Sequence, residues 1–309
     1  MPDTDAAYDV VVIGASLGGV AAALRAGTMG ARVCLLEATN WVGGQFTAQG
    51  VTKPDENQYV DTVGSTASYR EFRHLVRLYY RQNYRLSAPG QQQPLLNPGG
   101  SYPGFSMHPR VGHDVLVQQL TGNPNVHLRL QTRVASAEVQ GNTVQSVTAT
   151  DTSGAAARYV AKFFLDATDL GELLPLANVE HVVGAESRTQ TGEPGAPDAP
   201  RRDWIQPITV PVALERRPAG ERWTIVKPVQ YEQLKALQKY TIVDGYISTM
   251  FVPGKDMWSY RRFIAAANFD DPALPCDLSM INTSGNDYQG GTIPTGDPAS
   301  DLAVTEAAR

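Results

Sequence analysis

Glycines and a carboxylate near the start of the chain have the types and spacing that bind a dinucleotide. The loop Gly14-Ala15-Ser16-Leu17-Gly18-Gly19 stands between an apolar run and an Ala- and Leu-rich run. Such a loop needs a tight turn at its first glycine, a small residue where the pyrophosphate approaches, and a last glycine for close helix–strand packing. Gly14 and Gly19 fill the first and third roles. Ser16 takes the second role, and its hydroxyl is able to donate to a phosphate oxygen.

A carboxylate follows the glycine loop at the sequence separation where dinucleotide-binding proteins have the acid that binds the ribose. Glu37 comes about 20 residues after the loop, at the end of a second apolar run. A carboxylate there accepts hydrogen bonds from ribose hydroxyls and repels a 2′-phosphate, which disfavours NADP. The pair Gly43-Gly44 follows within a few residues and offers a second stretch of exposed backbone. That order suits FAD, whose diphosphate is long.

The elements that must position these residues are predicted directly around them. Residues 9–13 and 32–36 are short β-branched and apolar runs, typical of strands buried on both faces of a parallel sheet. Residues 17–29 between them are typical of a helix, and Gly30 closes it. The chain therefore begins with a βαβ unit. Helices are also predicted over 65–84 and 111–120, a long loop over 86–109, and strands over 126–130, 133–139, 143–150 and 159–165, with a hairpin turn at Gly141-Asn142.

A change of composition divides the chain. Residues 186–202 are rich in Pro, Gly, Thr and Asp and mark the clearest domain boundary. The predicted fold class is α/β: a Rossmann-like FAD-binding domain over residues 1–184, with a parallel sheet, a β-meander insertion and a helical or loop insertion over 65–125. A partial mixed α+β substrate domain over 185–309 follows it. The segments predicted there are strands over 208–214 and 258–266, a helix over 231–240, a Gly-rich loop over 282–296 and an uncapped helix start over 300–309, so we expect this domain to be incomplete.

Further motifs resemble those of a known family. After Gly43-Gly44-Gln45 come Gln49-Gly50-Val51, Gly64-Ser65-Thr66, Tyr79-Tyr80-Arg81, Ala167-Thr168-Asp169, Tyr260-Arg261-Arg262 and Asn286-Asp287-Tyr288. Together with the first loop and Glu37, they resemble the FAD-dependent oxidoreductases that have an N-terminal flavin-binding Rossmann domain of the glutathione-reductase type. The resemblance covers most of the chain and implies FAD as the cofactor. Members of that family are longer than this chain.

The resemblance also implies which residues contact FAD. Those implied to line the pyrophosphate are Gly14, Ser16, Gly18, Gly19, Ala167, Thr168 and Asp169. Those implied to follow the diphosphate towards the flavin are Gly43, Gly44 and Gln45. Glu37 is implied to bind the adenosine ribose, and Val134 to pair its main chain with adenine. Ser16 and Asp169 depart from the family pattern, which has glycine at both positions.

Five residues are candidates for proton transfer or substrate binding. A flavin performs hydride chemistry itself, so the protein needs to supply position, electrostatics and at most a proton. His108 and His113 flank a loop-to-helix junction, a suitable edge for a pocket. Arg261 is predicted in a strand beside Arg262, where one arginine binds an anionic substrate or the flavin, or both are ordinary surface charges. Asp287 and Tyr288 lie in a Gly-rich loop, where functional groups are often placed.

Composition narrows the classes of function. With 42% hydrophobic and 18% charged residues, the 309-residue chain is typical of a globular protein. Its net charge of −5 argues against a nucleic-acid partner and leaves a small-molecule substrate. No apolar run is long enough to cross a membrane, and the acidic N-terminus is not that of a signal peptide. Cys34 and Cys276 are too few for a disulfide framework, no third ligand suggests a metal, and reduced thiols favour a cytoplasmic location.

The sequence therefore predicts an FAD-dependent oxidoreductase that transfers hydride between the flavin and an unidentified small organic substrate. Two alternatives stay open. An NAD-dependent dehydrogenase of the short-chain type would use a Tyr-x-x-x-Lys pair, which Tyr231 and Lys235 imitate, although late in the chain. A non-catalytic or truncated FAD-fold binding protein is supported by the uncapped C-terminal segment.

Overall fold

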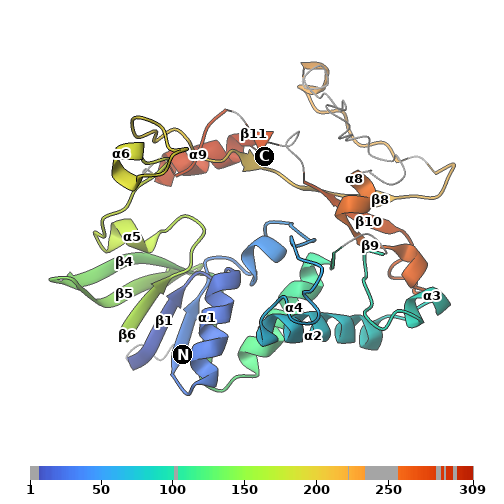
Figure 1. Cartoon of the computed structure of the whole chain (residues 1–309), viewed down its shortest axis with the longest axis horizontal. Coiled ribbons are helices and arrows are strands. Elements are labelled where there is room, and N and C mark those ends of the chain that lie inside the picture. Colours follow the sequence, from blue (N-terminus) through green and yellow to red (C-terminus); the bar gives the residue numbers. More distant parts are fainter. Residues whose placement is uncertain are drawn as a thin grey trace. The chain divides into compact units, whose positions relative to one another are not determined.

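Two compact units, interleaved along the sequence, make up the chain (Figure 1). The computed structural model describes residues 7–100, 104–221, 223–233, 257–282, 287–288, 290–294 and 298–308. Unit 1 comprises Met1–Gly44, Leu116–Val210 and Tyr288–Arg309, and unit 2 comprises Gln45–Val115 and Pro211–Asp287. The sequence predicted consecutive domains over 1–184 and 185–309, and the assignment of these ranges to cofactor and substrate binding stays a prediction.

A six-stranded sheet is the centre of unit 1 (Figure 1). Its strand order is β3-β2-β1-β6-β5-β4, formed by β1 (Ala7–Ile13), β2 (Val33–Leu36), β3 (Val126–Arg129), β4 (Thr132–Gln140), β5 (Thr143–Asp151) and β6 (Ala156–Asp166). β1 pairs in parallel with β2 and β6, and β2 pairs in parallel with β3. β5 pairs antiparallel with both β4 and β6, which gives the predicted meander. The α/β, Rossmann-like fold class is confirmed.

Burial explains why the first βαβ unit forms as the sequence predicts. All four residues of β2 are buried, as its uninterrupted apolar run requires. Helix α1 (Leu17–Thr28) has Ser16 as its N-cap and turns Val20, Ala23 and Gly27 inward. A Cβ at Gly27 would come within 2.7 Å of the Val126 side chain, so glycine lets the helix approach β3 closely. The chain then turns at Gly30, whose φ is 90°.

Shorter elements complete unit 1. They are α5 (Leu173–Leu176), α6 (Arg188–Thr191), β7 (Ile208–Thr209) and α9 (Pro298–Ala308). Helix α9 confirms the helical pattern predicted from residue 300 onward. Residues 186–202, the predicted boundary, contain α6, and reciprocal main-chain hydrogen bonds between Ala185 and Arg201 close this segment. The hairpin at Gly141 is also as predicted, since Gln140 pairs with Thr143 across it.

Unit 2 combines helices with a small antiparallel sheet. Its helices are α2 (Ala67–Asn83), α3 (Ala88–Gln91), α8 (Met257–Arg261) and the first part of α4 (Pro109–Thr121), which continues into unit 1. Its sheet has the order β8-β10-β9, formed by β8 (Val212–Arg216), β10 (Asp277–Ile281) and β9 (Arg262–Ile264). Unit 2 also contains the 3-10 turn η2 (Ala266–Asn268). The 3-10 turn η1 (Gly44–Phe46) and the strand β11 (Asp287–Tyr288) each include a point in the sequence where the chain passes from one unit to the other.

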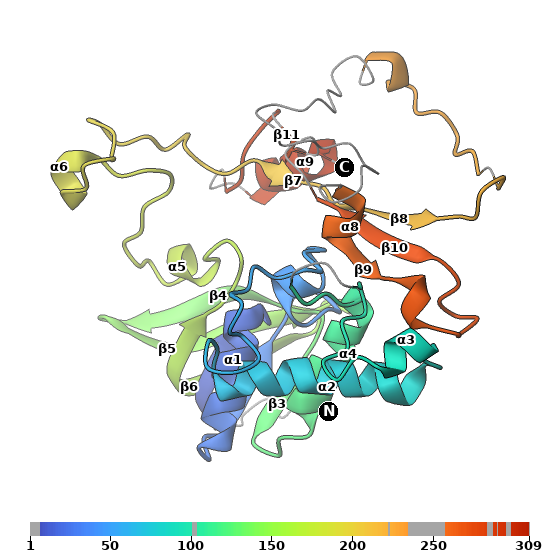
Figure 2. The ribbon, with the colours of Figure 1, turned by 45° about the vertical axis from the view of Figure 1, so that its right-hand side comes forward.

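Helix α2 is the longest described helix of unit 2, and its buried face organises that unit. Phe72, Val76 and Tyr80 recur at helical spacing and are buried. Figure 2 shows α2 beside α4, where the Tyr79 hydroxyl donates to Asp114 at 3.4 Å. Thr66 caps the helix by accepting a hydrogen bond from the Tyr69 N–H.

Two sequence predictions for unit 2 need correction. Residues 258–266 were expected to form one strand, but α8 occupies residues 257–261 and only 262–264 form β9. The alternation of apolar and polar side chains is compatible with one helical turn, and the buried Ser279 hydroxyl fixes that turn by donating to the Trp258 carbonyl at 3.0 Å. The strand expected over 208–214 is divided into β7 and β8 around Pro211, which lacks the N–H that a continuous ladder needs.

Some predicted segments lie partly outside the described residues. The helix expected over 231–240 is described only to residue 233, where it is helical. The Gly-rich loop expected over 282–296 is described at residues 282, 287–288 and 290–294. The loop expected over 86–109 contains the short helix α3.

Candidate functional site

Three turns meet at the carboxyl edge of the parallel strands in unit 1. β1, β2 and β6 run in the same direction, so the residues after Ile13, Leu36 and Asp166 emerge on one edge of the sheet. This is the edge where open α/β sheets bind their ligands. The turns contain the glycine loop, Glu37 and the Ala167-Thr168 pair, all predicted cofactor residues.

The first turn is fixed by two glycines that leave no room for side chains. Gly14 has φ 92°, and a Cβ there would lie 2.5 Å from the carbonyl oxygen of Ala167. A Cβ at Gly19 would overlap the carbonyl oxygen of Gly14. Gly18 is different, because its nearest neighbour would be the Ser16 hydroxyl at 3.8 Å. The roles predicted for Gly14 and Gly19, a tight turn and close packing, follow from these contacts.

Ser16 is the N-cap residue of α1. The Ser16 hydroxyl oxygen accepts a hydrogen bond from the Gly19 N–H at 3.3 Å. The N–H groups of Leu17 and Gly18 open the helix, and at this position they have no acceptor within the helix. Outward-pointing amides together with the helix dipole make such an end a phosphate-binding site.

Glu37 joins the end of β2 to the glycine loop. One carboxylate oxygen accepts a hydrogen bond from the Ala15 N–H at 2.7 Å, and the other accepts from the Thr39 N–H at 2.8 Å. Each carboxylate oxygen has two lone pairs, so both retain one for a ligand hydroxyl. The side chain is therefore held in a defined orientation and is still able to accept from a ribose.

The second glycine pair packs against the first loop. The Gly43 N–H donates to the Ala15 carbonyl at 2.8 Å. Gly44 has φ 48°, and a Cβ there would lie 3.1 Å from the Cα of Ser16. Backbone approach therefore requires glycine at position 44, whereas Gly43 has φ 108°, a conformation that favours glycine. Gln45 follows in η1, where it is exposed and its carbonyl accepts from the Val51 N–H.

The third turn is held by a carboxylate that sequence reasoning did not single out. Asp166 accepts from the Thr168 N–H and hydroxyl through one oxygen, at 3.0 and 2.7 Å, and from the Leu173 N–H through the other. The Ala167 N–H donates to the Ile13 carbonyl at 2.7 Å. Asp169 is exposed beyond this turn. The signal was present in the sequence, since an Asx residue at a strand end commonly organises the next turn.

Val134 lies on the strand that begins beside Glu37. The Thr132 N–H donates to the Glu37 carbonyl and the Gln131 N–H to the Thr39 carbonyl, each at 2.8 Å. β4 therefore starts next to the end of β2, and Val134, its third residue, is buried. The structure brings together the residues predicted to hold the adenosine half of a dinucleotide.

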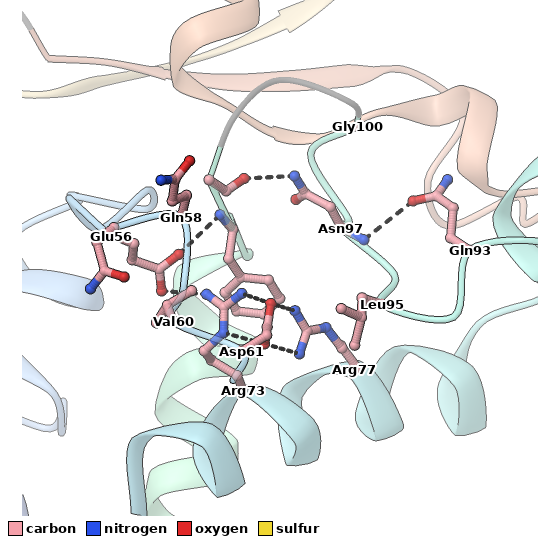
Figure 3. Close-up of a pocket in the computed structure, with 13 residues that line it drawn as sticks. Glu56, Gln58, Val60, Asp61, Arg73, Arg77, Gln93, Leu95, Asn97 and Gly100 are labelled. Atoms are coloured by element: carbon pink, nitrogen blue, oxygen red, sulfur yellow. Dashed lines mark hydrogen bonds and ion pairs between the residues drawn. The ribbon is translucent and has the colours of Figure 1, made fainter. Parts of the chain in front are cut away.

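Unit 2 contains a polar pocket of about 470 Å³ (Figure 3). Arg73 and Arg77 rise into it from successive turns of α2, and Asp61 lies between their guanidinium groups. Arg73 contacts Asp61 through two nitrogens, at 3.0 and 2.7 Å, and Arg77 does so at 3.0 and 3.1 Å. Arg73 also forms an ion pair with Glu56, which accepts from Tyr69 at 2.6 Å. The four charges compensate one another.

The ion pairs also set the charge state of Asp61. Burial by itself would raise the pKa of this carboxyl, but the hydrogen bonds from Arg73 and Arg77 outweigh burial and bring the pKa to about 2. The phenyl ring of Phe105 lies beneath both guanidinium groups, at 4.5 and 4.9 Å. Sequence reasoning missed this cluster, although charges at positions 73 and 77 share the apolar face of α2.

His108 and His113 lie near the start of α4 and differ in exposure. The His108 Nδ1 accepts from the Arg110 N–H at 3.1 Å, and its ring packs edge-on against Phe263. Burial, and then the charge of Arg110, lower the pKa of His108, with Asp114 opposing them. A neutral His108 thus caps α4. His113 is buried within that helix.

Arg261 and Arg262 do not face opposite sides of a strand, because Arg261 ends α8 and Arg262 begins β9. Arg262 pairs with Asp277 at 3.0 Å, whereas the Arg261 guanidinium lies over the Tyr260 ring at 4.7 Å. Lys53, which sequence reasoning also missed, lies over the same ring at 4.3 Å. It had no recognisable pattern, because it is an isolated lysine in a loop.

The last two sequence candidates, Asp287 and Tyr288, stand where the chain passes from unit 2 to unit 1. Asp287 and Tyr288 form β11, and Asn286 beside them is outside the described residues. A Cβ at Gly290 would overlap the Tyr288 hydroxyl, so this ring lies over a glycine. A role for these residues in catalysis stays a prediction.

Cys34 and Cys276 are both buried and free. Burial raises the pKa of Cys34 to about 11. Within the described ranges, no three His, Cys, Asp or Glu side chains are grouped as a metal site would require. In the same part of the chain, no helix is both long enough and apolar enough to span a membrane.

Comparison with known proteins identifies a family. The model of a family described as FAD dependent oxidoreductase matches residues 9–307. No curated protein matches the chain. The family match decides between FAD and the NAD alternative in favour of FAD.

Several solved structures share part of the fold at low similarity. They include the myxobacterial chondrochloren halogenase CndH (18% identity, TM-score 0.37, 52% of this chain and 37% of that one). A second is the anhydrotetracycline hydroxylase OxyS from Streptomyces rimosus (18% identity, TM-score 0.35, 54% of this chain and 32% of that one). A third is the p-nitrophenol 4-monooxygenase PnpA from Pseudomonas putida (20% identity, TM-score 0.33, 52% of this chain and 40% of that one). The matched region thus spans well under half of each of these chains.

Adjacent glycines at the start of α1 provide a matched pair of substitutions. We expect Gly19→Ala to destabilise unit 1 and weaken nucleotide binding, because its Cβ would displace the Gly14 turn. Gly18→Ala should keep or raise stability, since its Cβ meets only the Ser16 hydroxyl and alanine favours helix by up to about 1 kcal/mol. Thermal unfolding of both variants measures the difference. Equal unfolding midpoints would contradict the packing role assigned to Gly19.

Removal of the Asp61 carboxylate should leave the buried Arg77 guanidinium without its ion pair and leave Arg73 paired with Glu56 alone. We expect Asp61→Asn to lower the free energy of unfolding by about 3–5 kcal/mol, measured by chemical denaturation. Asp198→Asn is the control, because Asp198 pairs with Arg188 on the surface. Because the pKa of Asp61 is lowered, the stability that its ion pairs contribute is fully present above pH 3.8, the ordinary pKa of the carboxyl. This stability is lost as the pH falls through about 2. The free energy of unfolding of Asp61→Asn should therefore not show this fall at acidic pH. If the variant and the wild type lose stability equally as the pH falls, the ion pairs of Asp61 do not stabilise the fold.

Proposed function

The chain belongs to the FAD-dependent oxidoreductase family, and on this premise we propose that it oxidises or reduces a small organic substrate by hydride transfer to or from bound FAD. The observation that supports this most is the convergence of three turns around the N-terminus of α1. Gly14, Gly19 and Gly44 allow the backbone approach that a dinucleotide site needs. When bound, FAD supplies the hydride chemistry, and the protein binds and orients it.

The residues of unit 1 fit the phosphate and adenosine parts of FAD. The N–H groups of Leu17 and Gly18 would donate to the pyrophosphate, where the dipole of α1 favours negative charge. Glu37 would accept from the ribose hydroxyls through the lone pairs that its two main-chain donors leave unused. The main chain of Val134 would lie beside adenine, because β4 starts next to Glu37.

Substrate binding is assigned to unit 2. Its polar pocket and the cations near Tyr260 offer groups that recognise a small molecule by hydrogen bonding and charge. His108, His113, Asp287 and Tyr288 remain candidates for proton transfer. The net charge of −5 favours a small molecule over a nucleic acid, and the two free thiols favour a cytoplasmic location.

The role of Glu37 gives a direct test of the cofactor site. Glu37→Gln keeps one acceptor oxygen but presents an N–H₂ group to one of its two main-chain donors, and it loses the charge. We expect FAD affinity to fall roughly tenfold or more, as for loss of a charge-assisted hydrogen bond. Flavin fluorescence quenching on titration with FAD measures it, and Glu180→Gln, an exposed acid of unit 1, is the control.

Two outcomes would contradict the proposal. One is recovery of NAD from the denatured protein, with no binding of flavin on titration. The other is FAD affinity that is equal in Glu37→Gln and the wild type, which would place the adenosine half elsewhere.

A further inference from the structure

The polar pocket of unit 2 is built within that unit alone. Its described lining residues all lie between residues 56 and 105, and unit 2 contains this whole range. Figure 3 shows Glu56 and Gln58 on one side of the pocket and Gln93 and Asn97 on the other. The volume of about 470 Å³ lies within the range of small-molecule sites, roughly 300–1,000 Å³. The pocket is therefore large enough to hold a ligand.

The charges around the pocket cancel, which disfavours a charged ligand. Asp61 lies between Arg73 and Arg77, and Glu56 pairs with Arg73. Burial opposes the ionisation of Asp61, but the hydrogen bonds from both arginines lower its pKa to about 2, so the carboxylate is charged at neutral pH. Each oxygen of Asp61 already accepts from both arginines. A ligand carboxylate would meet two anions here, and a ligand ammonium would meet two arginines.

Donor groups on the pocket wall are not all used by the protein. Arg77 has five N–H groups and donates three of them, one to the Leu96 carbonyl and two to Asp61. The Gln58 side chain is exposed and forms no hydrogen bond with any described residue. Its amide offers two further N–H groups and a carbonyl oxygen. Donors for a ligand are thus present both on α2 and on the loop that faces it.

Acceptor groups on the wall also keep part of their capacity. Among the described residues, the Oε2 of Glu56 accepts only from the Phe105 N–H, at 3.2 Å. The Oε1 of Gln93 accepts only from the Asn97 N–H, at 3.3 Å. A carboxylate or amide oxygen has two lone pairs, so each of these atoms keeps one. The pocket therefore combines unused donors and unused acceptors without a net charge.

We propose that this pocket binds a neutral polyhydroxylated molecule, a sugar or a polyol, as the substrate of the enzyme. A hydroxyl group both donates and accepts, so several hydroxyls on one small molecule match a wall that offers both. Leu95 lines the same pocket and is 57% exposed, which gives an apolar surface for the C–H groups of the molecule. The assignment as substrate rests on the proposed oxidoreductase function, whereas the assignment as ligand rests on the pocket alone.

Ligand-observed NMR titration of the flavin-loaded protein with D-glucose, sucrose and myo-inositol tests the binding. Cyclohexanol, which has the ring of myo-inositol but a single hydroxyl, measures what the ring contributes. D-glucuronate, which adds a carboxylate to the sugar, measures the effect of charge. We expect at least one neutral polyol to bind saturably, and more tightly than both cyclohexanol and D-glucuronate.

Two variants and a matched control locate the bound polyol. Gln58→Ala should weaken its affinity about three- to tenfold, as for loss of one neutral hydrogen bond or two. Arg77→Lys keeps a charge opposite Asp61 but loses the forked donors, and we expect affinity at least about tenfold weaker. Gln82→Ala removes an exposed glutamine of α2 that does not line the pocket, so it should bind as the wild type does. Circular dichroism establishes that each variant is folded before it is titrated.

Three results would overturn the proposed site: no neutral polyol binds, cyclohexanol or D-glucuronate binds more tightly than every polyol, or Gln58→Ala and Arg77→Lys both bind with unchanged affinity. The titration is repeated on protein stripped of FAD, where we expect binding to persist, because the pocket lies within unit 2. If the chain does not bind FAD, the oxidoreductase function fails, whereas this titration still decides the ligand of the pocket.

Anaerobic addition of the bound polyol to the flavin-loaded protein tests its assignment as the substrate. The polyol would give up a hydride from a carbon that carries a hydroxyl and release the hydroxyl proton to solvent, which leaves a carbonyl compound and reduced flavin. We therefore expect the absorbance of the oxidised flavin to be bleached. Saturable binding without bleaching would overturn the assignment as substrate.

Discussion

Close approach between backbone segments at the carboxyl edge of the six-stranded sheet constrains the rest of unit 1. The turn after β1, the start of α1 and the turn after β6 touch through main-chain atoms, because Gly14 and Gly19 carry no side chain. Gly44 brings a fourth segment against Ser16. Once these contacts form, the first amides of α1 and the Glu37 carboxylate are placed on one edge. The same packing that closes the fold therefore positions the groups that we propose to bind a diphosphate and a ribose.

Charge compensation has the corresponding role in unit 2. Asp61 neutralises Arg73 and Arg77, and together with Glu56 these side chains hold the loop around residues 56–61 on α2. Arg262 and Asp277 do the same between β9 and β10. Arg261 and Lys53 both lie over the Tyr260 ring.

The sequence predicts the first βαβ unit well because each of its signals is local. A continuous apolar run, a glycine loop and an Ala-rich helix agree with one another, and the predicted bounds differ from β1, α1 and β2 by only one or two residues. Residues 257–264 were harder to predict, since a buried tryptophan followed by polar and aromatic residues suits one helical turn as well as a strand. A contact from Ser279, distant in sequence, decides between them. Lys53 and Arg261 meet at Tyr260 through long-range packing, for which no local pattern exists.

We propose that the pyrophosphate of FAD lies on the first amides of α1, and amide NMR of the deuterated, ¹⁵N-labelled protein can test this placement. We expect addition of FAD to shift the resonances of Leu17 and Gly18 more than those of unit 2 residues on α2. Those two amides should move downfield, as N–H groups do when they donate to phosphate. An equal concentration of NAD should leave them nearly unchanged. FAD-induced shifts confined to unit 2, with Leu17 and Gly18 unaffected, would show that the pyrophosphate does not bind at the start of α1.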